Sequence, residues 1–188
     1  MIDNVCSTKK QTAYFFAIFF AIVLVTAETA VAQYPISPKL SWWYEARFGM
    51  IIHLGSYSYL SRGEWTFFND NYWKTKYQTQ VSAKFNPTNF NAGTIAGLAK
   101  KTGMKYLIIT AKYHEGFCMW QTDVQSFKDT IGTALYDLPD FTPFGTRDIL
   151  QELKDSCEAQ GIKFGLYYSI MDWNHSSQKA MMWAIKKN

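Results

Sequence analysis

The sequence predicts an α/β fold: the N-terminal portion, about three βα units, of a (β/α)8-like TIM barrel. Its apolar strands and amphipathic helices alternate in the order strand 48–53, helix 91–101, strand 105–111, helix 147–160 and strand 163–169. Apolar strands that alternate with helices indicate a parallel sheet. The connections after the strands are long, as they are where a barrel carries its functional loops. No glycine-rich turn follows a strand, which disfavours a dinucleotide-binding fold.

The first strand and the first helix each have a local signal. Phe48–His53 is a short apolar run that ends in a histidine. The helix that follows has apolar residues at helical spacing, Ile95, Leu98 and Ala99. Gly103 then stands where a helix C-cap is expected, directly before the second strand.

The second helix and the third strand repeat this unit. The helix 147–160 should bury one apolar face, formed by Ile149, Leu150, Leu153 and Cys157. Gly161 ends this helix as Gly103 ends the first, and the third strand follows at once. The turns from helix to strand are short, in contrast to the long loops after the strands, which again favours a barrel of β/α units.

Titratable and aromatic side chains follow all three strands: His53; Glu64 and Trp65; Tyr113, His114 and Glu115; Tyr168, Asp172 and Trp173. The carboxyl ends of parallel strands meet at one end of a barrel, so these groups should converge. Imidazoles, phenols, indoles and carboxylates around one opening suit a polyhydroxylated ligand, because neutral histidine both donates and accepts hydrogen bonds.

Several of these residues have a structural alternative. Glu64 could form a salt bridge with Arg62, and Asp172 could cap the turn that follows it. Strand alternation allows only one of Tyr167 and Tyr168 to face the barrel interior.

The composition argues against other classes of function. The net charge is +4 and no basic run exceeds two residues, so nucleic acid is not an expected partner. His114-Glu115 does not begin an H-E-x-x-H motif, and no metal or other cofactor is expected. The absence of G-x-S-x-G argues against a serine hydrolase. Cys118 and Cys157 are expected to be free thiols, with one disulfide as the alternative.

Residues 1–32 have the pattern of a cleaved secretory signal peptide. Two lysines precede the apolar run Tyr14–Val25, which is short for a membrane span, and Ala30-Val31-Ala32 fits a cleavage site. An uncleaved anchor is the alternative. We expect an exported protein in a periplasmic, extracellular or lysosome-like compartment, without membrane contact after cleavage, whose residues 33–188 form a partial catalytic barrel.

Several motifs, in one order, resemble the N-terminal part of the retaining α-L-fucosidases, glycoside hydrolase family 29. They are ARFGMIIH at 46–53, GEW at 63–65, FNP at 85–87, GMKY at 103–106, AKYHEGF at 111–117, GIK at 161–163, YYS at 167–169 and DW at 172–173. The resemblance covers about residues 42–175, and the number and order of its motifs make it specific.

The resemblance implies hydrolysis of terminal α-linked L-fucose from an oligosaccharide or a glycoprotein glycan, with retention and without a metal. It also implies that the fucose pocket is lined by the residues that match the family motifs: His53, Glu64, Trp65, Tyr113, His114 and Tyr168. Many members carry a His-His pair where this chain has Tyr113-His114, and the phenol of Tyr113 could donate in place of the first imidazole.

No catalytic residue is assigned within this chain. A retaining glycosidase needs two carboxyl groups about 5 Å apart. In the family the nucleophile is an aspartate on a later strand and the acid/base lies further on, so both are expected beyond Asn188. A complete barrel needs about 250 residues, and residues 33–188 are fewer. We therefore expect a truncated fucosidase, inactive alone; the alternatives are a fucose-binding module without catalysis and an inactive remnant.

Overall fold

The structure is a computed structural model that describes residues 37–124 and 135–175. The signal peptide predicted at 1–32 lies outside these residues. The chain divides into two compact units, with the boundary after Tyr44, and each is described by itself. Within the described residues, no helix is long and apolar enough to cross a membrane.

The described part of the first unit is short. It contains the 3-10 helix η1 (Pro38–Leu40) and the start of helix α2 (Ser41–Ala46). The rings of Trp42 and Trp43 meet edge to face, with centroids 5.6 Å apart.

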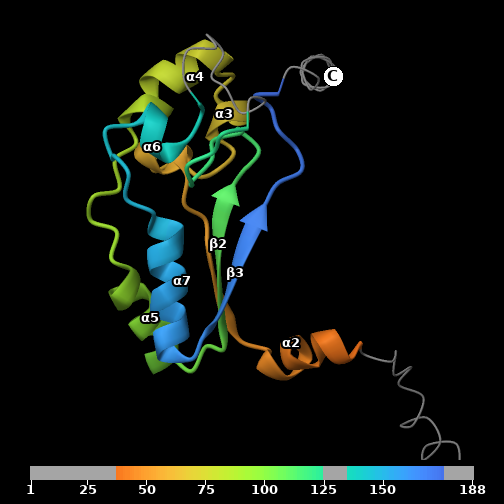
Figure 1. The fold of residues 1–188 in the computed structure, drawn as a ribbon. Coiled ribbons are helices and arrows are strands. Elements are labelled where there is room, and N and C mark those ends of the chain that lie inside the picture. Colours follow the sequence, from red (N-terminus) through yellow and green to blue (C-terminus); the bar gives the residue numbers. More distant parts are fainter. Residues whose placement is uncertain (1–36, 125–134, 176–188) are drawn as a thin grey trace, which may run out of the picture. The chain divides into compact units, whose positions relative to one another are not determined.

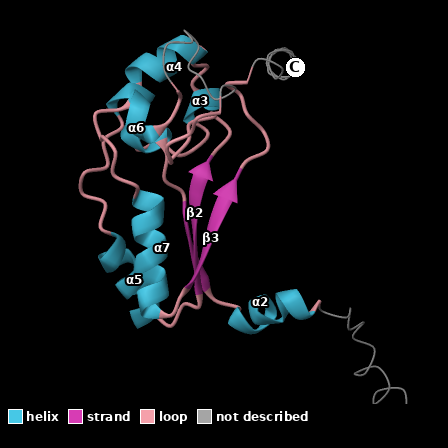
Figure 2. Ribbon diagram, in the orientation of Figure 1, coloured by secondary structure: helices cyan, strands magenta, loops and turns pink. Residues whose placement is uncertain are grey.

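The second unit contains a parallel sheet with the strand order β1 (Gly49–Ile52), β2 (Tyr106–Lys112) and β3 (Lys163–Tyr168) (Figure 2). Gly49 lies opposite Tyr106, which in turn lies opposite Lys163. The ring of Tyr106 occupies the space that a Cβ at position 49 would need, so this close approach requires glycine. The α/β fold with three parallel strands is thus confirmed.

Two longer helices, α5 (Ala92–Lys101) and α7 (Ile149–Gln160), match the predicted helices and run beside the strands (Figure 1). The side chain of Asn91 accepts a hydrogen bond from a backbone N–H in the first turn of α5, and Asp148 does the same for α7. Both helices end near the predicted glycine: Gly103 and Gly161 have φ angles of 81° and 68°, which glycine adopts without strain.

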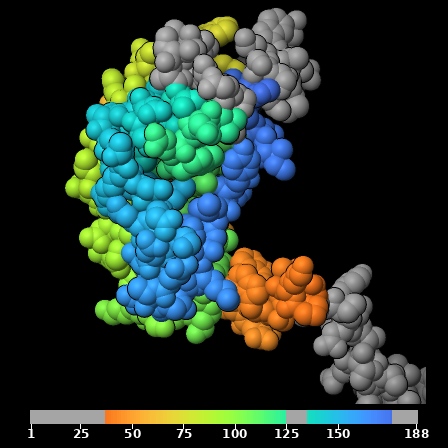
Figure 3. Space-filling model, viewed as in Figure 1, coloured from red at the N-terminus to blue at the C-terminus, as the bar shows by residue number. Residues whose placement is uncertain are grey.

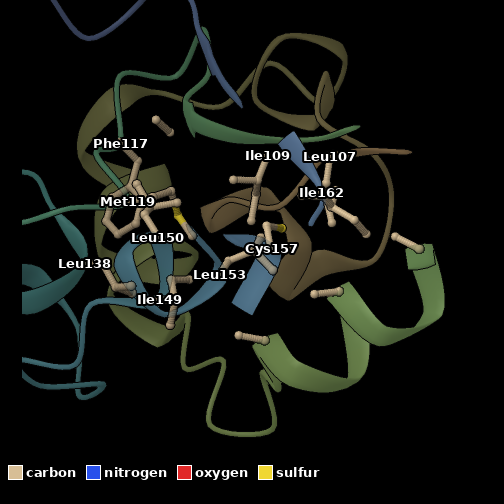
Figure 4. Packing of buried hydrophobic residues seen from close by; sticks show 14 of the residues in the cluster. Leu107, Ile109, Phe117, Met119, Leu138, Ile149, Leu150, Leu153, Cys157 and Ile162 are labelled. Carbon is tan, nitrogen blue, oxygen red and sulfur yellow. The ribbon is translucent and has the colours of Figure 1, made fainter. Parts of the chain in front are cut away.

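The main core lies between the helices and the covered face of the sheet (Figure 4). Leu107 and Ile109 of β2 and Leu153 of α7 are fully buried in it. The predicted apolar face of α7 is confirmed, because its four members are all buried. Leu98 of α5 differs: it fits the helical spacing but is 53% exposed.

The long connections contain short helices that were not predicted from the sequence: η2 (Ser56–Leu60), α3 (Thr66–Asn69), α4 (Lys74–Gln80), η3 (Ser82–Lys84) and α6 (Leu138–Phe141). Helices this short are not stable by themselves. Those after β1 are held by a second apolar cluster, in which Phe67, Tyr77 and Val81 pack against Trp173 from the connection after β3. In Figure 1 the arrowheads of β2 and β3 point to the end where α3, α4 and α6 lie.

Strand β3 lies at one edge of the sheet. Figure 3 shows it at the molecular surface beside α7.

Candidate functional site

Three rings from three different strands meet at the carboxyl end of the sheet. His53 follows β1, Tyr113 follows β2 and Tyr167 lies near the end of β3. The ring centroids of His53 are 5.8 Å from Tyr113 and 6.1 Å from Tyr167, and those of the two tyrosines are 5.8 Å apart.

A second group of rings continues from this one. The imidazole of His114 lies 4.2 Å from the ring of Tyr113, 5.4 Å from Trp65 and 5.2 Å from Trp173. Trp65 and Trp173 are 5.3 Å apart. We call the six residues the ring cluster: His53, Trp65, Tyr113, His114, Tyr167 and Trp173.

Glu64 brings a carboxylate to the ring cluster. Burial is the main cause that raises the pKa of Tyr113 to about 12, and the nearby charge of Glu64 adds to this effect. Arg62 does not pair with Glu64, because its guanidinium binds Asp70 at 2.8 Å. The salt bridge between Glu64 and Arg62, which was the structural alternative for Glu64, is therefore not formed.

Of the six residues that the resemblance places in the fucose pocket, Tyr168 is the one that the structure does not bring to the ring cluster. Its side chain is 49% exposed on the other face of β3, where its ring lies 6.3 Å from Trp120 and 5.1 Å from Nζ of Lys112. There it lines a groove of about 370 Å³ between β3 and α7. Because side chains alternate along a strand, Tyr167 takes the position facing the cluster.

A buried cation that the sequence pattern did not indicate lies at the end of β2. Lys112 is 1% exposed, and its Nζ lies 3.3 Å from Oδ2 of Asp172. The same Nζ donates hydrogen bonds to the carbonyl oxygens of Ser169 at 3.0 Å and Met171 at 3.3 Å. Lys112 thus ties the end of β2 to the connection after β3. Its only signal in the sequence is a lysine at the end of a buried strand.

Asp172 has the capping role that was given as its alternative. Its Oδ1 accepts hydrogen bonds from the backbone N–H groups of Asn174 at 2.8 Å and His175 at 3.0 Å. Gly116, with a φ of 84°, lies so close that a Cβ there would clash with this carboxylate. The carboxylate is committed to the turn and to Lys112.

Glu115 lies inside the protein and not in the cluster. It is 2% exposed; its Oε1 accepts a hydrogen bond from the hydroxyl of Ser56 at 3.3 Å, and its Oε2 has no partner among the described residues. Burial raises its pKa to about 8. Of the three carboxylates singled out from the sequence, Glu115 is therefore buried inside the protein and Asp172 is bound to the turn and to Lys112, whereas Glu64 lies next to Trp65 of the cluster.

Thr110 holds the backbone next to His53. Its hydroxyl accepts a hydrogen bond from the N–H of Leu54 at 2.8 Å and donates one to the carbonyl of Leu54 at 2.5 Å. Thr110 is 1% exposed. The sequence gives no signal for this contact, because it joins residues 56 positions apart.

Other chemistry can be stated for the described ranges alone. There, no group of three or more His, Cys, Asp or Glu side chains is placed to hold a metal ion. Cys118 and Cys157 are both buried free thiols.

Enzymes with α/β folds carry their active sites at the carboxyl ends of parallel strands. The ring cluster and its polar groups lie at this position. A family model described as Alpha-L-fucosidase matches residues 26–187 of this chain. The chain belongs to the alpha-L-fucosidase family, as its motifs predicted.

Individual relatives agree with the family. The chain is 30% identical to a putative alpha-L-fucosidase of Caenorhabditis elegans and 31% identical to the plasma alpha-L-fucosidase of Homo sapiens, over 73% and 72% of its length. It spans about 30% of the length of each of these relatives.

Solved structures give the same result for the fold. Alpha-L-fucosidase AlfC from Lactobacillus casei in complex with alpha-L-fucose product has a TM-score of 0.61 at 38% identity, covering 73% of this chain and 43% of that one. Alpha-L-fucosidase isoenzyme 1 from Paenibacillus thiaminolyticus has a TM-score of 0.63 at 37% identity, covering 73% and 30%.

Proposed function

We propose that this chain is the substrate-binding N-terminal part of a retaining α-L-fucosidase barrel and that its ring cluster holds a terminal α-L-fucose of a glycan. The observation that carries the proposal is the continuous ring cluster, to which all three strands contribute at their carboxyl ends. Aromatic faces suit the C–H faces of a sugar, and imidazole and phenol groups suit its hydroxyls. The family and the solved relative with bound fucose support this assignment.

The fucose contacts we propose are His53, Glu64, Trp65, Tyr113 and His114, with Tyr167 in the place that the resemblance gave to Tyr168. The face on which each tyrosine lies supports this exchange, because Tyr167 contacts two of the rings. Residues 1–32 are proposed as a signal peptide of an exported protein.

We also propose that the two catalytic carboxyl groups follow Asn188 in a longer protein. Among the candidate carboxylates, Glu115 is buried and Asp172 is bound to a turn and to Lys112, which leaves Glu64 as the one candidate without such a structural role. A retaining mechanism needs two such groups about 5 Å apart. The share of its relatives that the chain spans is consistent with this proposal.

Calorimetry with L-fucose on the full chain tests the binding role, and an aryl α-L-fucoside tests catalysis. We expect binding without turnover. The matched pair Tyr167→Ala and Tyr168→Ala tests the assignment of the two adjacent tyrosines, because they lie on opposite faces of one strand. A loss of about tenfold in affinity for Tyr167→Ala alone is expected, on the scale of one lost contact. Rapid turnover by the unmodified chain, or a loss confined to Tyr168→Ala, would contradict the corresponding proposal.

A further inference from the structure

Two short hydrogen bonds determine where His114 carries its proton. Nδ1 of His114 lies 2.5 Å from Oγ of Ser169, and this Oγ lies 2.8 Å from the carbonyl oxygen of Met171. A carbonyl oxygen has no proton, so the single hydroxyl proton of Ser169 lies on the bond to Met171. Without it, two oxygen atoms would face each other at this distance with lone pairs only. Ser169 must therefore accept its second hydrogen bond from Nδ1 of His114.

The opposite nitrogen of the ring is then an acceptor. A neutral imidazole has one N–H group, so Nε2 carries the lone pair when Nδ1 carries the proton. No described residue hydrogen-bonds to Nε2 of His114. The only fully buried side-chain N or O atom without a partner in the described part of the chain is Oε2 of Glu115, so Nε2 of His114 is at least partly accessible to solvent.

The charged groups near His114 keep the ring neutral on balance. Burial is the largest cause that lowers its pKa, and the cation of Lys112 on β2 lowers it further. The carboxylate of Glu64, from the connection after β1, opposes both effects without reversing them. Lys112 also helps to fix Met171, because Nζ donates to the same carbonyl oxygen that accepts from Ser169.

We propose that Ser169 is a positioning residue that holds His114 in the Nδ1-protonated tautomer, so that Nε2 accepts a hydrogen bond from a hydroxyl group of the bound sugar. The sugar contact rests on the proposed function, whereas the tautomer does not. An acceptor at this point selects a hydroxyl, which can donate, over a fluorine atom at the same carbon, which cannot.

Nitrogen NMR of the full chain, labelled at histidine, tests the tautomer in the absence of sugar. The chain has three histidines, and His114→Asn identifies the signals of His114. We expect an unprotonated Nε2 and a protonated Nδ1 in the unmodified chain. In Ser169→Ala the Nε2-protonated form should become populated, whereas Ser169→Thr, which keeps a hydroxyl, should retain the original form. Ser82→Ala is the matched control, because it removes another buried serine hydroxyl, bound to Tyr136 at 2.6 Å.

A protonated Nε2 in the unmodified chain overturns the proposal, and this measurement does not depend on any variant folding. An unchanged tautomer in Ser169→Ala, or an equal change in Ser82→Ala, overturns the role of Ser169.

Titration with L-fucose and its three monodeoxyfluoro analogues, substituted at C2, C3 or C4, tests the sugar contact. We expect one analogue to bind the unmodified chain about tenfold more weakly than fucose because of the lost donor. In Ser169→Ala the penalty at this carbon alone should shrink, since Nε2 can then donate to fluorine. Equal penalties in both proteins overturn the contact. A chain with the expected tautomer that does not bind fucose overturns the proposed function, while the tautomer still supports the role of Ser169.

Discussion

The two ends of the parallel sheet are stabilised by different kinds of interaction. Beside the helices, the core consists of apolar side chains such as Leu107, Ile109 and Leu153. At the carboxyl ends of the strands, a lysine and two carboxylates are buried within a few residues of the ring cluster. The end beside the helices, the apolar half, gains stability mainly from the burial of apolar side chains. The carboxyl end, the polar half, depends on buried charged groups such as Lys112 and Asp172 keeping their partners.

The sharpest test of this contrast is Lys112→Met, which removes the buried cation but keeps an apolar chain of similar length. We expect a loss of about 3–5 kcal/mol in the free energy of unfolding, because the carboxylate of Asp172 is left buried without its cation. Urea unfolding measures the loss. Adding Asp172→Asn should recover part of it. Arg62→Met, at an exposed ion pair, should cost only about 0–1 kcal/mol; equal losses for both lysine and arginine variants would contradict the contrast.

In the apolar half, Leu153→Ala should cost about 3 kcal/mol, since it leaves a cavity at a fully buried position. Leu98→Ala on the neighbouring helix is the matched control and should cost below about 1 kcal/mol, because Leu98 is half exposed. Thermal unfolding gives both values. The fucose affinity of Leu153→Ala, measured while the chain is folded, should be unchanged; a loss of affinity would show that the two halves are coupled.

Thr110→Val should cost about 2 kcal/mol, because it leaves the backbone N–H and carbonyl of Leu54 without their partner. The affinity for L-fucose should fall as well, since Leu54 follows His53 directly. Thr110→Ser keeps the hydroxyl and should retain most of the affinity. If serine and valine weaken binding equally, the hydroxyl does not position His53.

Glu115→Gln should change how stability depends on pH. The pKa of Glu115 in the folded chain is about 8, above its ordinary value of 4.5, so the folded state binds this proton more tightly. Its contribution is complete below about pH 4.5 and is lost as the pH rises to about 8, by at most about 1.4 kcal/mol per pH unit. The glutamine variant should lack this fall.

The pH window for that comparison follows from His114. The pKa of His114 lies below its ordinary value of 6.5, so its protonation affects stability only at lower pH. Urea unfolding at pH 7 and pH 8 therefore isolates Glu115. An identical decline in the unmodified chain and in Glu115→Gln would show that Glu115 is not the group responsible.

The sequence predicts the apolar half well because its signals are local. Helical spacing, capping residues and terminal glycines lie within each segment, so the predicted ends of α5 and α7 are correct and their predicted starts differ by one and two residues. The short helices after β1 could not be predicted, because Trp173 from a distant connection holds them in place.

In the polar half, motifs identified the rings but not their supports. Alternation shows that Tyr167 and Tyr168 face opposite ways, yet it does not say which one faces the cluster. That choice depends on the twist and the neighbours of β3. Thr110 and Ser169 carry no sequence signal either, because their partners come from other connections or depend on the path of a loop.

The connections after β2 and after β3 are joined by hydrogen bonds, and this has a consequence for how the protein can diversify. Among these bonds, Nζ of Lys112 donates to the carbonyl of Ser169, His114 bonds Ser169, and the N–H of Trp173 donates to the carbonyl of His114 at 2.6 Å. The connection after β1 is anchored by hydrogen bonds of Ser56 and Lys74, and Trp65 between these residues contacts the ring of His114. Insertions and replacements at exposed positions between the anchors, such as Tyr59 and Trp73, can therefore accumulate during evolution, whereas replacing Glu64 or Trp65 would change the surroundings of His114. We expect homologues with different glycan preferences to differ most in this segment.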